Sequence, residues 1–148
     1  MEWKILWKSS GFPDNMNPWT FYDFLDGRGV NLIRGWLDSL PLKVAAKIDA
    51  RILYMRTVRV WPEQYVSALK GWSDIFELRV VSAGAQYRPI CCYGPNRGDV
   101  IIVHGAIEKG KLPTRVLKHA DGNRRIAQTE PSRIEHHVFR QGATAGQF

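Results

Sequence analysis

Cysteine is scarce in this chain of 148 residues, and long apolar runs are absent from it. The two cysteines, Cys91 and Cys92, are adjacent in a strand-like segment, so they face opposite sides and predict neither a structural disulfide nor a metal site. No apolar run approaches the roughly 20 residues that a membrane span needs. The N-terminus is too short and too amphipathic for a signal peptide. We therefore expect a cytoplasmic protein with no membrane partner.

The common motifs of phosphate, metal and nucleophile chemistry are also missing. The chain has no glycine-rich phosphate loop, no Cys-x-x-Cys pair, no His-Glu-x-x-His and no Gly-x-Ser-x-Gly. We therefore expect no metal and no other cofactor.

Positive charge is in excess, and it is unevenly distributed. The net charge is +7; residues 1–28 hold three Lys or Arg against four Asp or Glu, and residues 29–148 hold 18 against 10. A basic region of this kind indicates a polyanionic partner, with nucleic acid the first candidate. Charge that serves only solubility is the alternative.

Residues 72–111 are predicted to form an antiparallel three-stranded meander. Apolar and polar residues alternate from Phe76 to Val80, which is the period of a half-buried strand. A second strand is expected over residues 87–93, followed by a Gly-Pro-Asn-Arg-Gly turn. The β-branched run at residues 100–103 predicts a third strand, buried on both faces.

Two helices are predicted before the meander. Asn31 can cap the first, and Pro41 suits the first turn of the second, which runs to about Arg56. The second helix should bury its apolar face and expose a polar face that carries Lys43, Lys47, Asp49 and Arg51. Together the helices form an αα-hairpin.

The two ends of the chain complete the prediction. Residues 3–7 alternate like a strand, residues 11–28 read as a loop with a possible helical turn near Trp19–Leu25, and residues 58–71 as a connector. A last helix should begin at Pro113 and weaken or end at Gly122-Asn123. From Gln128 the polar composition predicts a loose tail.

These elements predict an α+β fold. A small antiparallel sheet, made of an N-terminal strand and the meander, should carry the αα-hairpin on one face, with a C-terminal helix besides. We expect one domain over residues 1–127 and a polar C-terminal tail over residues 128–148.

The cationic residues of the meander are the candidate functional residues. Strand parity assigns Glu77 and Arg79 to the outward face, with Arg88 beside Arg79 on the next strand, and Lys109 and Lys111 near the same surface. Arginine binds phosphate oxygens through a two-pronged fork and lysine adds a point charge, so the group suits a phosphodiester. Solvated strand charges are the alternative reading.

Several segments together resemble a known family. The runs FELRVVSAGAQYRPICCYG and DVIIVHGAIEKGKLP, the helix ending in ADGNRRIA and the earlier RGWLDSLPLKVAAKI are similar, in order and spacing, to the HigB-type, phage-derived (Gp49-like) branch of the RelE/ParE toxin superfamily. The resemblance covers about residues 30–127. The chain departs from the pattern at Ala106, which replaces an aromatic residue, at Glu108, which replaces a lysine, and at Glu77, where some RelE members carry a catalytic lysine.

The resemblance implies a RelE-like fold and a toxin that cuts mRNA on the ribosome and is silenced by an antitoxin, often a helix-turn-helix protein. By position it implies catalytic roles for Arg79, Arg88, His104 and Lys109. Residues expected to contact RNA are Lys111, Arg97 and Arg115.

The implied reaction is attack of a ribose 2′-hydroxyl on the adjacent phosphate. Arg79 and Arg88 would stabilise the developing charge, and Lys109 would assist them or act as the acid. The base stays open, because Glu77 beside arginine is a poor base and a lone His104 in an apolar strand is more often structural. Arg88→Ala is expected to remove activity and leave the fold intact. The alternatives are a ParE-like toxin that inhibits a protein such as gyrase, and a decayed phage protein that only binds nucleic acid or antitoxin.

Overall fold

The computed structural model describes residues 17–140, and within them seven strands form one sheet flanked by three α-helices. The helices are α2 (Leu32–Ser39), α3 (Leu42–Met55) and α4 (Thr114–Thr129). The strands are β1 (Thr20–Phe24), β2 (Val66–Leu69), β3 (Trp72–Leu78), β4 (Val80–Ser82), β5 (Ala85–Tyr93), β6 (Asp99–Ile107) and β7 (Ile134–His136). The predicted α+β class is confirmed.

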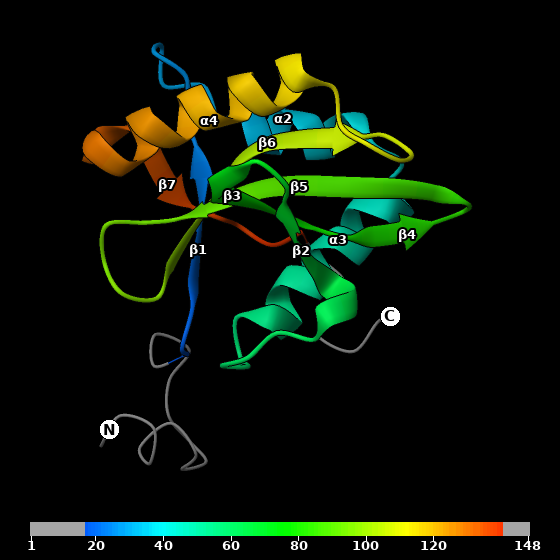
Figure 1. Cartoon of the computed structure of the whole chain (residues 1–148). Coiled ribbons are helices and arrows are strands. Elements are labelled where there is room, and N and C mark those ends of the chain that lie inside the picture. The colour runs from blue at the N-terminus through cyan, green and yellow to red at the C-terminus, as the bar shows by residue number, and fades with distance from the viewer. Residues whose placement is uncertain (1–16, 141–148) are drawn as a thin grey trace.

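The sheet has the order β2-β3-β5-β6-β1-β7, with β4 also paired to β5. Among the described strands every pairing is antiparallel except that of β1 with β6. Figure 1 shows α4 along one side of the sheet and α3 on the opposite side. The predicted meander is confirmed as β3, β5 and β6, and the expected connector at residues 58–71 contains a further strand, β2.

The helical turn expected near Trp19–Leu25 is wrong, because this segment is strand β1. Its Thr-Phe-Tyr-Asp-Phe sequence is rich in residues that favour strands, and it lies between β6 and β7, where both of its edges are paired. The strand expected at residues 3–7 lies outside the described residues.

The αα-hairpin is confirmed as α2 and α3. The Asn31 side chain caps α2 by accepting a hydrogen bond from the backbone N–H of Arg34 at 2.8 Å, and Pro41 is the residue before α3. The exposed face predicted for α3 is wrong in part, because Asp49 and Arg51 are buried. Both have polar partners: Asp49 contacts His137, and Arg51 donates to the Arg79 carbonyl at 2.6 Å.

Helix α4 does not end at Gly122-Asn123 but continues to Thr129. The buried Asn123 side chain donates to the Val103 carbonyl of β6 at 2.9 Å, so this residue fixes the helix to the sheet. The loose tail expected from Gln128 is wrong for residues 128–140, which continue through a short 3₁₀ turn, η3 (Pro131–Arg133), into β7.

Each face of the sheet has its own apolar core. One core packs α2 and α3 against residues such as Phe21, Leu78 and Cys91, and the other packs α4 against residues such as Ile90 and Cys92. The adjacent cysteines therefore face opposite sides, as predicted, and both are buried and free.

Gly105 allows α2 to approach β6 closely. A Cβ atom at this position would lie 2.0 Å from the Cδ2 atom of Trp36, so only glycine leaves room for the indole. Within residues 17–140, none of the helices has the length and apolar character needed to cross a lipid bilayer.

Candidate nucleic-acid interface

The buried ion pair between Glu77 of β3 and Arg88 of β5 lies at the centre of the candidate site. Their side chains are only 2% and 7% exposed. Arg88 donates through Nε to Glu77 Oε2 and through Nη2 to Glu77 Oε1, the latter at 3.0 Å. This is the two-pronged geometry of a strong arginine–carboxylate pair.

The expectation that Glu77 and Arg88 face solvent is therefore wrong. Strand parity correctly separated Glu77 from Phe76 and Leu78, which belong to the core on the α2–α3 side. The opposite face is not open, however, because α4 and the β6–α4 loop (residues 108–113) cover it.

Arg88 also holds the β6–α4 loop. Its Nη1 group donates to the carbonyl of Glu108 at 3.3 Å and to the carbonyl of Gly110. Four of the five N–H groups of an arginine are thus engaged within the protein. Gly110 has φ of +73°, which suits the turn, and the exposed Lys109 and Lys111 lie on either side of it.

Arg79 shares Glu77 with Arg88 but remains partly accessible. Its Nε atom lies 3.5 Å from Glu77 Oε1, its Nη2 group donates to Ser67 Oγ at 3.1 Å, and its side chain is 42% exposed. One carboxylate therefore serves two guanidinium groups, and the three side chains together keep one positive charge.

His104 lies on the same face as Arg88. The β5–β6 ladder pairs His104 with Ile90 and Ala106 with Arg88, so His104 is a diagonal neighbour of Arg88, with Cα atoms about 7–8 Å apart. Burial, and secondarily the nearby His119, lower the pKa of His104.

The structure adds His119 to the candidate residues. The two imidazole rings meet edge to face, with centroids 5.2 Å apart. His119 is exposed on α4. The sequence gives only a weak indication of this pair. The apolar face of α4 that includes Val116 and Ala120 places His119 next to the sheet, but the sequence does not show which strand the helix packs against.

The remaining predicted residues lie at two different ends of the sheet. Arg115 is exposed in the first turn of α4, directly after the β6–α4 loop. Arg97 is in the β5–β6 turn at the other end of these strands, where it lines a cavity of about 220 Å³ with Trp19 and Arg59. We call the cationic group at the first end the basic end; its members are Arg79, Lys109, Lys111 and Arg115.

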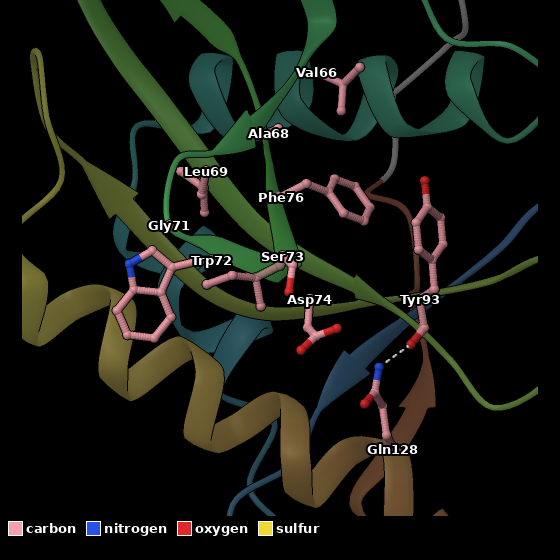
Figure 2. Close-up of a pocket in the computed structure, with 11 residues that line it drawn as sticks. Val66, Ala68, Leu69, Gly71, Trp72, Ser73, Asp74, Phe76, Tyr93 and Gln128 are labelled. Carbon is pink, nitrogen blue, oxygen red and sulfur yellow. Dashed lines mark hydrogen bonds between the residues drawn. The ribbon is translucent and has the colours of Figure 1, made fainter.

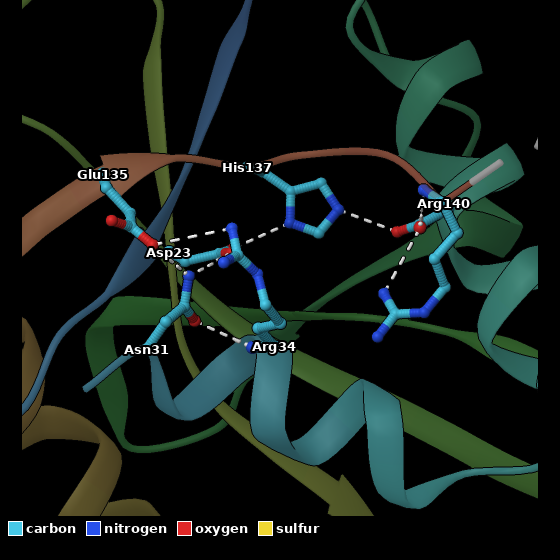
Figure 3. Close-up of polar contacts among 7 residues, drawn as sticks. Asp23, Asn31, Arg34, Glu135, His137 and Arg140 are labelled. Atoms are coloured by element: carbon cyan, nitrogen blue, oxygen red, sulfur yellow. Dashed lines mark hydrogen bonds and ion pairs between the residues drawn. The ribbon is translucent and has the colours of Figure 1, made fainter.

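A second polar cluster fixes the C-terminal segment to the domain. His137 Nδ1 lies 2.7 Å from Asp23 Oδ1 of β1, and Nε2 lies 2.7 Å from Asp49 Oδ1 of α3. Asp49 Oδ2 accepts from the backbone N–H of Arg140 at 2.8 Å. Figure 3 shows His137 beside Asp23, with Asn31 also hydrogen-bonded to Asp23.

Burial alone would lower the pKa of His137, but its hydrogen bonds to Asp23 and Asp49 raise the pKa to about 9. The ring is therefore a cation that donates to a carboxylate from each nitrogen. Because it is buried between β1, α3 and the chain that follows β7, we interpret this cluster as a structural clasp.

Comparison with known proteins identifies one family. The model of the phage derived protein Gp49-like family (DUF891) matches residues 35–125, well over half of the chain. Neither the curated proteins nor the solved structures contain a match. The matched range runs from α2 into α4 and includes all the candidate site residues, whereas β1 and β7 lie outside it, and with them Asp23 and His137 of the clasp. The chain therefore belongs to the Gp49-like family of phage-derived proteins.

Proposed function

We propose that this protein is the toxin of a type II toxin–antitoxin system and that it cleaves mRNA. The proposal assigns it to the HigB-type branch of the RelE/ParE superfamily. The observation that carries it is the His104–His119 pair, with ring centroids 5.2 Å apart, on the face of the sheet where the basic end lies. Two imidazoles beside several cations supply the proton transfers and the charge stabilisation that RNA cleavage needs.

His104 is the general base in this proposal. Burial lowers its pKa, so the ring is unprotonated at neutral pH and can accept the proton of a ribose 2′-hydroxyl. The exposed His119 gives a proton to the departing 5′-oxygen. The base that the sequence left open is thus His104 of β6, and the residue that α4 adds is the acid, His119.

The basic end stabilises the charge on the phosphate. Lys109 and Lys111 are exposed on the loop, and the guanidinium of Arg79 is partly accessible. Arg115 extends the cationic surface along α4, where a strand of RNA can continue.

Arg88 is a positioning residue in this scheme. Its N–H groups are directed to Glu77 and to two loop carbonyls, so it acts on RNA through the loop that carries Lys109 and Lys111. This role differs from direct phosphate binding, which the sequence pattern suggested.

The proposal includes the partners that such a toxin requires. An antitoxin, for which a helix-turn-helix protein is the expected type, would silence it. The substrate would be mRNA on the ribosome, and the site of action the cytoplasm.

Expression in bacteria without an antitoxin tests the proposal. Wild-type protein should stop growth and produce new 5′ ends in mRNA, and His104→Gln and His119→Gln should abolish both. His136→Gln is the matched control, because His136 is exposed on β7, away from the proposed site. Growth arrest with intact mRNA would refute RNA cleavage and favour a ParE-like protein target.

A further inference from the structure

A cavity of about 660 Å³ opens between the β2–β3 hairpin and the end of β5. We call it the β2–β3 pocket. It exists because β3 and β5 are in register only at Phe76–Cys91 and Glu77–Ile90, so the first half of β3 diverges from the end of β5. Its volume is within the range of natural small-ligand sites, roughly 300–1,000 Å³.

Aromatic rings form much of the pocket wall. The rings of Phe76 and Tyr93 have centroids 4.9 Å apart, and Tyr93 is half exposed. In Figure 2 these two rings lie next to one another, and the Trp72 indole lies at the far side of the pocket. Phe76 is buried, so the half-exposed Tyr93 ring is the one that offers a flat surface of the kind against which unpaired nucleobases stack.

Asp74 is the one charged residue in the pocket lining, and its side chain is 62% exposed. Gln128, which also lines the pocket, is already engaged: its Nε2 group donates to the Tyr93 carbonyl at 2.7 Å and its Oε1 atom accepts from Arg124. Trp72, Ser73 and Tyr93 also line the pocket with polar groups, but the Asp74 carboxylate is the charged one, and it accepts hydrogen bonds from the donors of a ligand.

Cations lie at the border of the pocket and not in its lining. Lys70 is exposed between Leu69 and Gly71, which both line the pocket, and Arg124 Nη2 is 3.9 Å from Asp74 Oδ2. An acidic, aromatic interior with cations outside suits a base that enters the pocket while its phosphates stay at the rim.

We propose that the β2–β3 pocket binds an unpaired nucleobase of the RNA, with guanine preferred. Guanine presents two adjacent N–H donors, N1–H and the N2 amine, to the two oxygens of a carboxylate, whereas uracil has a single N–H donor. This inference rests on the proposed function and adds a specificity site to it. His104 pairs with Ile90, three positions before Tyr93 and about 10 Å from it along β5, so the recognised base lies close to the cleaved bond.

Binding of short RNAs, measured by fluorescence anisotropy, tests the pocket apart from cleavage. The probes are five-nucleotide strands of uridine, and the same strands with a central guanosine, adenosine or cytidine. To exclude cleavage, every ribose of each strand carries a 2′-O-methyl group, which removes the attacking hydroxyl. The guanine strand should bind about tenfold more tightly than the all-uracil strand, the gain expected of one good two-pronged contact.

Two charge-matched variants decide the result. Asp74→Asn should remove the guanine preference, whereas Glu63→Gln, which removes an exposed carboxylate outside the pocket lining, should retain it. Equal affinity for all four strands would overturn the inference and would favour a protein as the ligand of the pocket. A guanine preference that survives Asp74→Asn would overturn it as well.

The same variants separate this inference from the proposed function. Guanine-selective binding without mRNA cleavage in cells would support the pocket and contradict the nuclease. Cleavage whose sequence preference is the same in wild type and Asp74→Asn would support the nuclease and contradict the pocket.

Discussion

Removing Arg88 should destabilise the protein, contrary to what an exposed strand arginine would do. In Arg88→Ala, the Glu77 carboxylate stays 2% exposed and loses its two-pronged partner. Breaking a buried ion pair in this way typically costs about 3–5 kcal/mol. Arg79 remains 3.5 Å from Glu77 and offsets part of the loss, so we expect a decrease of about 3 kcal/mol in the free energy of unfolding.

Urea unfolding followed by circular dichroism measures this decrease. Arg79→Ala is the control, since its partly exposed guanidinium should contribute less than about 1 kcal/mol. The double variant Glu77→Leu with Arg88→Met should recover most of the stability, because well-packed apolar residues often replace a buried pair without loss.

A second measurement separates the ion pair from the loop. The double variant still lacks the hydrogen bonds from Arg88 to the Glu108 and Gly110 carbonyls. Trypsin should therefore cut at Lys109 and Lys111 faster in the double variant than in wild type. If Arg88→Ala has the wild-type urea midpoint and the wild-type rate of loop cleavage, the role assigned to Arg88 is refuted.

Three further predictions follow from the fold and its charges. The pKa of His137 is about 9 in the folded protein, above the roughly 6.5 of an unfolded histidine, so its stabilisation, of order 3 kcal/mol, is complete below pH 6.5 and is lost as the pH rises to 9 and beyond. Between pH 6.5 and 9 the urea midpoint should fall in wild type and in His136→Gln, the control at the exposed neighbouring residue, but not in His137→Gln. The same dependence of the midpoint on pH in all three proteins would exclude the clasp. Gly105→Ala should destabilise the protein by about 1–3 kcal/mol, because the added methyl group meets Trp36. Gly122→Ala, in open space within α4, should stabilise it by up to about 1 kcal/mol. Thermal unfolding measures both changes, and a small effect of the same sign in both variants would contradict this reasoning. RNA affinity should fall by about 0.7 log units per log unit of salt for each phosphate contacted, and Lys109→Glu should make that slope shallower while Lys43→Glu on α3 should not; an interaction that salt does not weaken would contradict backbone binding.

Local patterns predicted the elements whose signals lie within a few residues. The Asn31 cap, the apolar spacing of α2 and α3 and the alternation in β3 each depend on neighbours along the chain, and each matches the structure. Helix α4 was predicted too short, because the contact that offsets Gly122 comes from Asn123 to β6, which is distant in sequence.

The errors share a physical cause, which is that burial by distant segments leaves no local pattern. Parity assigned Glu77 to the correct face but gave no sign that the loop after β6 covers it. The polar composition after Gln128 indicated a loose tail, yet His137 and Arg140 make their contacts with Asp23 and Asp49, about a hundred residues earlier.

The sequence predicted the basic residues of the candidate site but not the groups that the proposal uses for proton transfer. Arg79, Lys109 and Lys111 could be grouped from strand order alone. The His104–His119 pair required the packing of α4 on β6, and the engagement of Arg88 required the path of the loop. Arg97 was expected to contact RNA together with Lys111 and Arg115, although the turn that carries it lies at the other end of β5 and β6.

The chemistry of the RNA ends tests the central claim most directly. Attack by a 2′-hydroxyl leaves a 2′,3′-cyclic phosphate on one fragment and a 5′-hydroxyl on the other. Purified protein, incubated with mRNA on programmed ribosomes, should produce these ends, and neither His104→Gln nor His119→Gln should produce them. Intact mRNA, fragments that end in a 3′-hydroxyl and a 5′-phosphate, or full cleavage by both histidine variants would contradict the account.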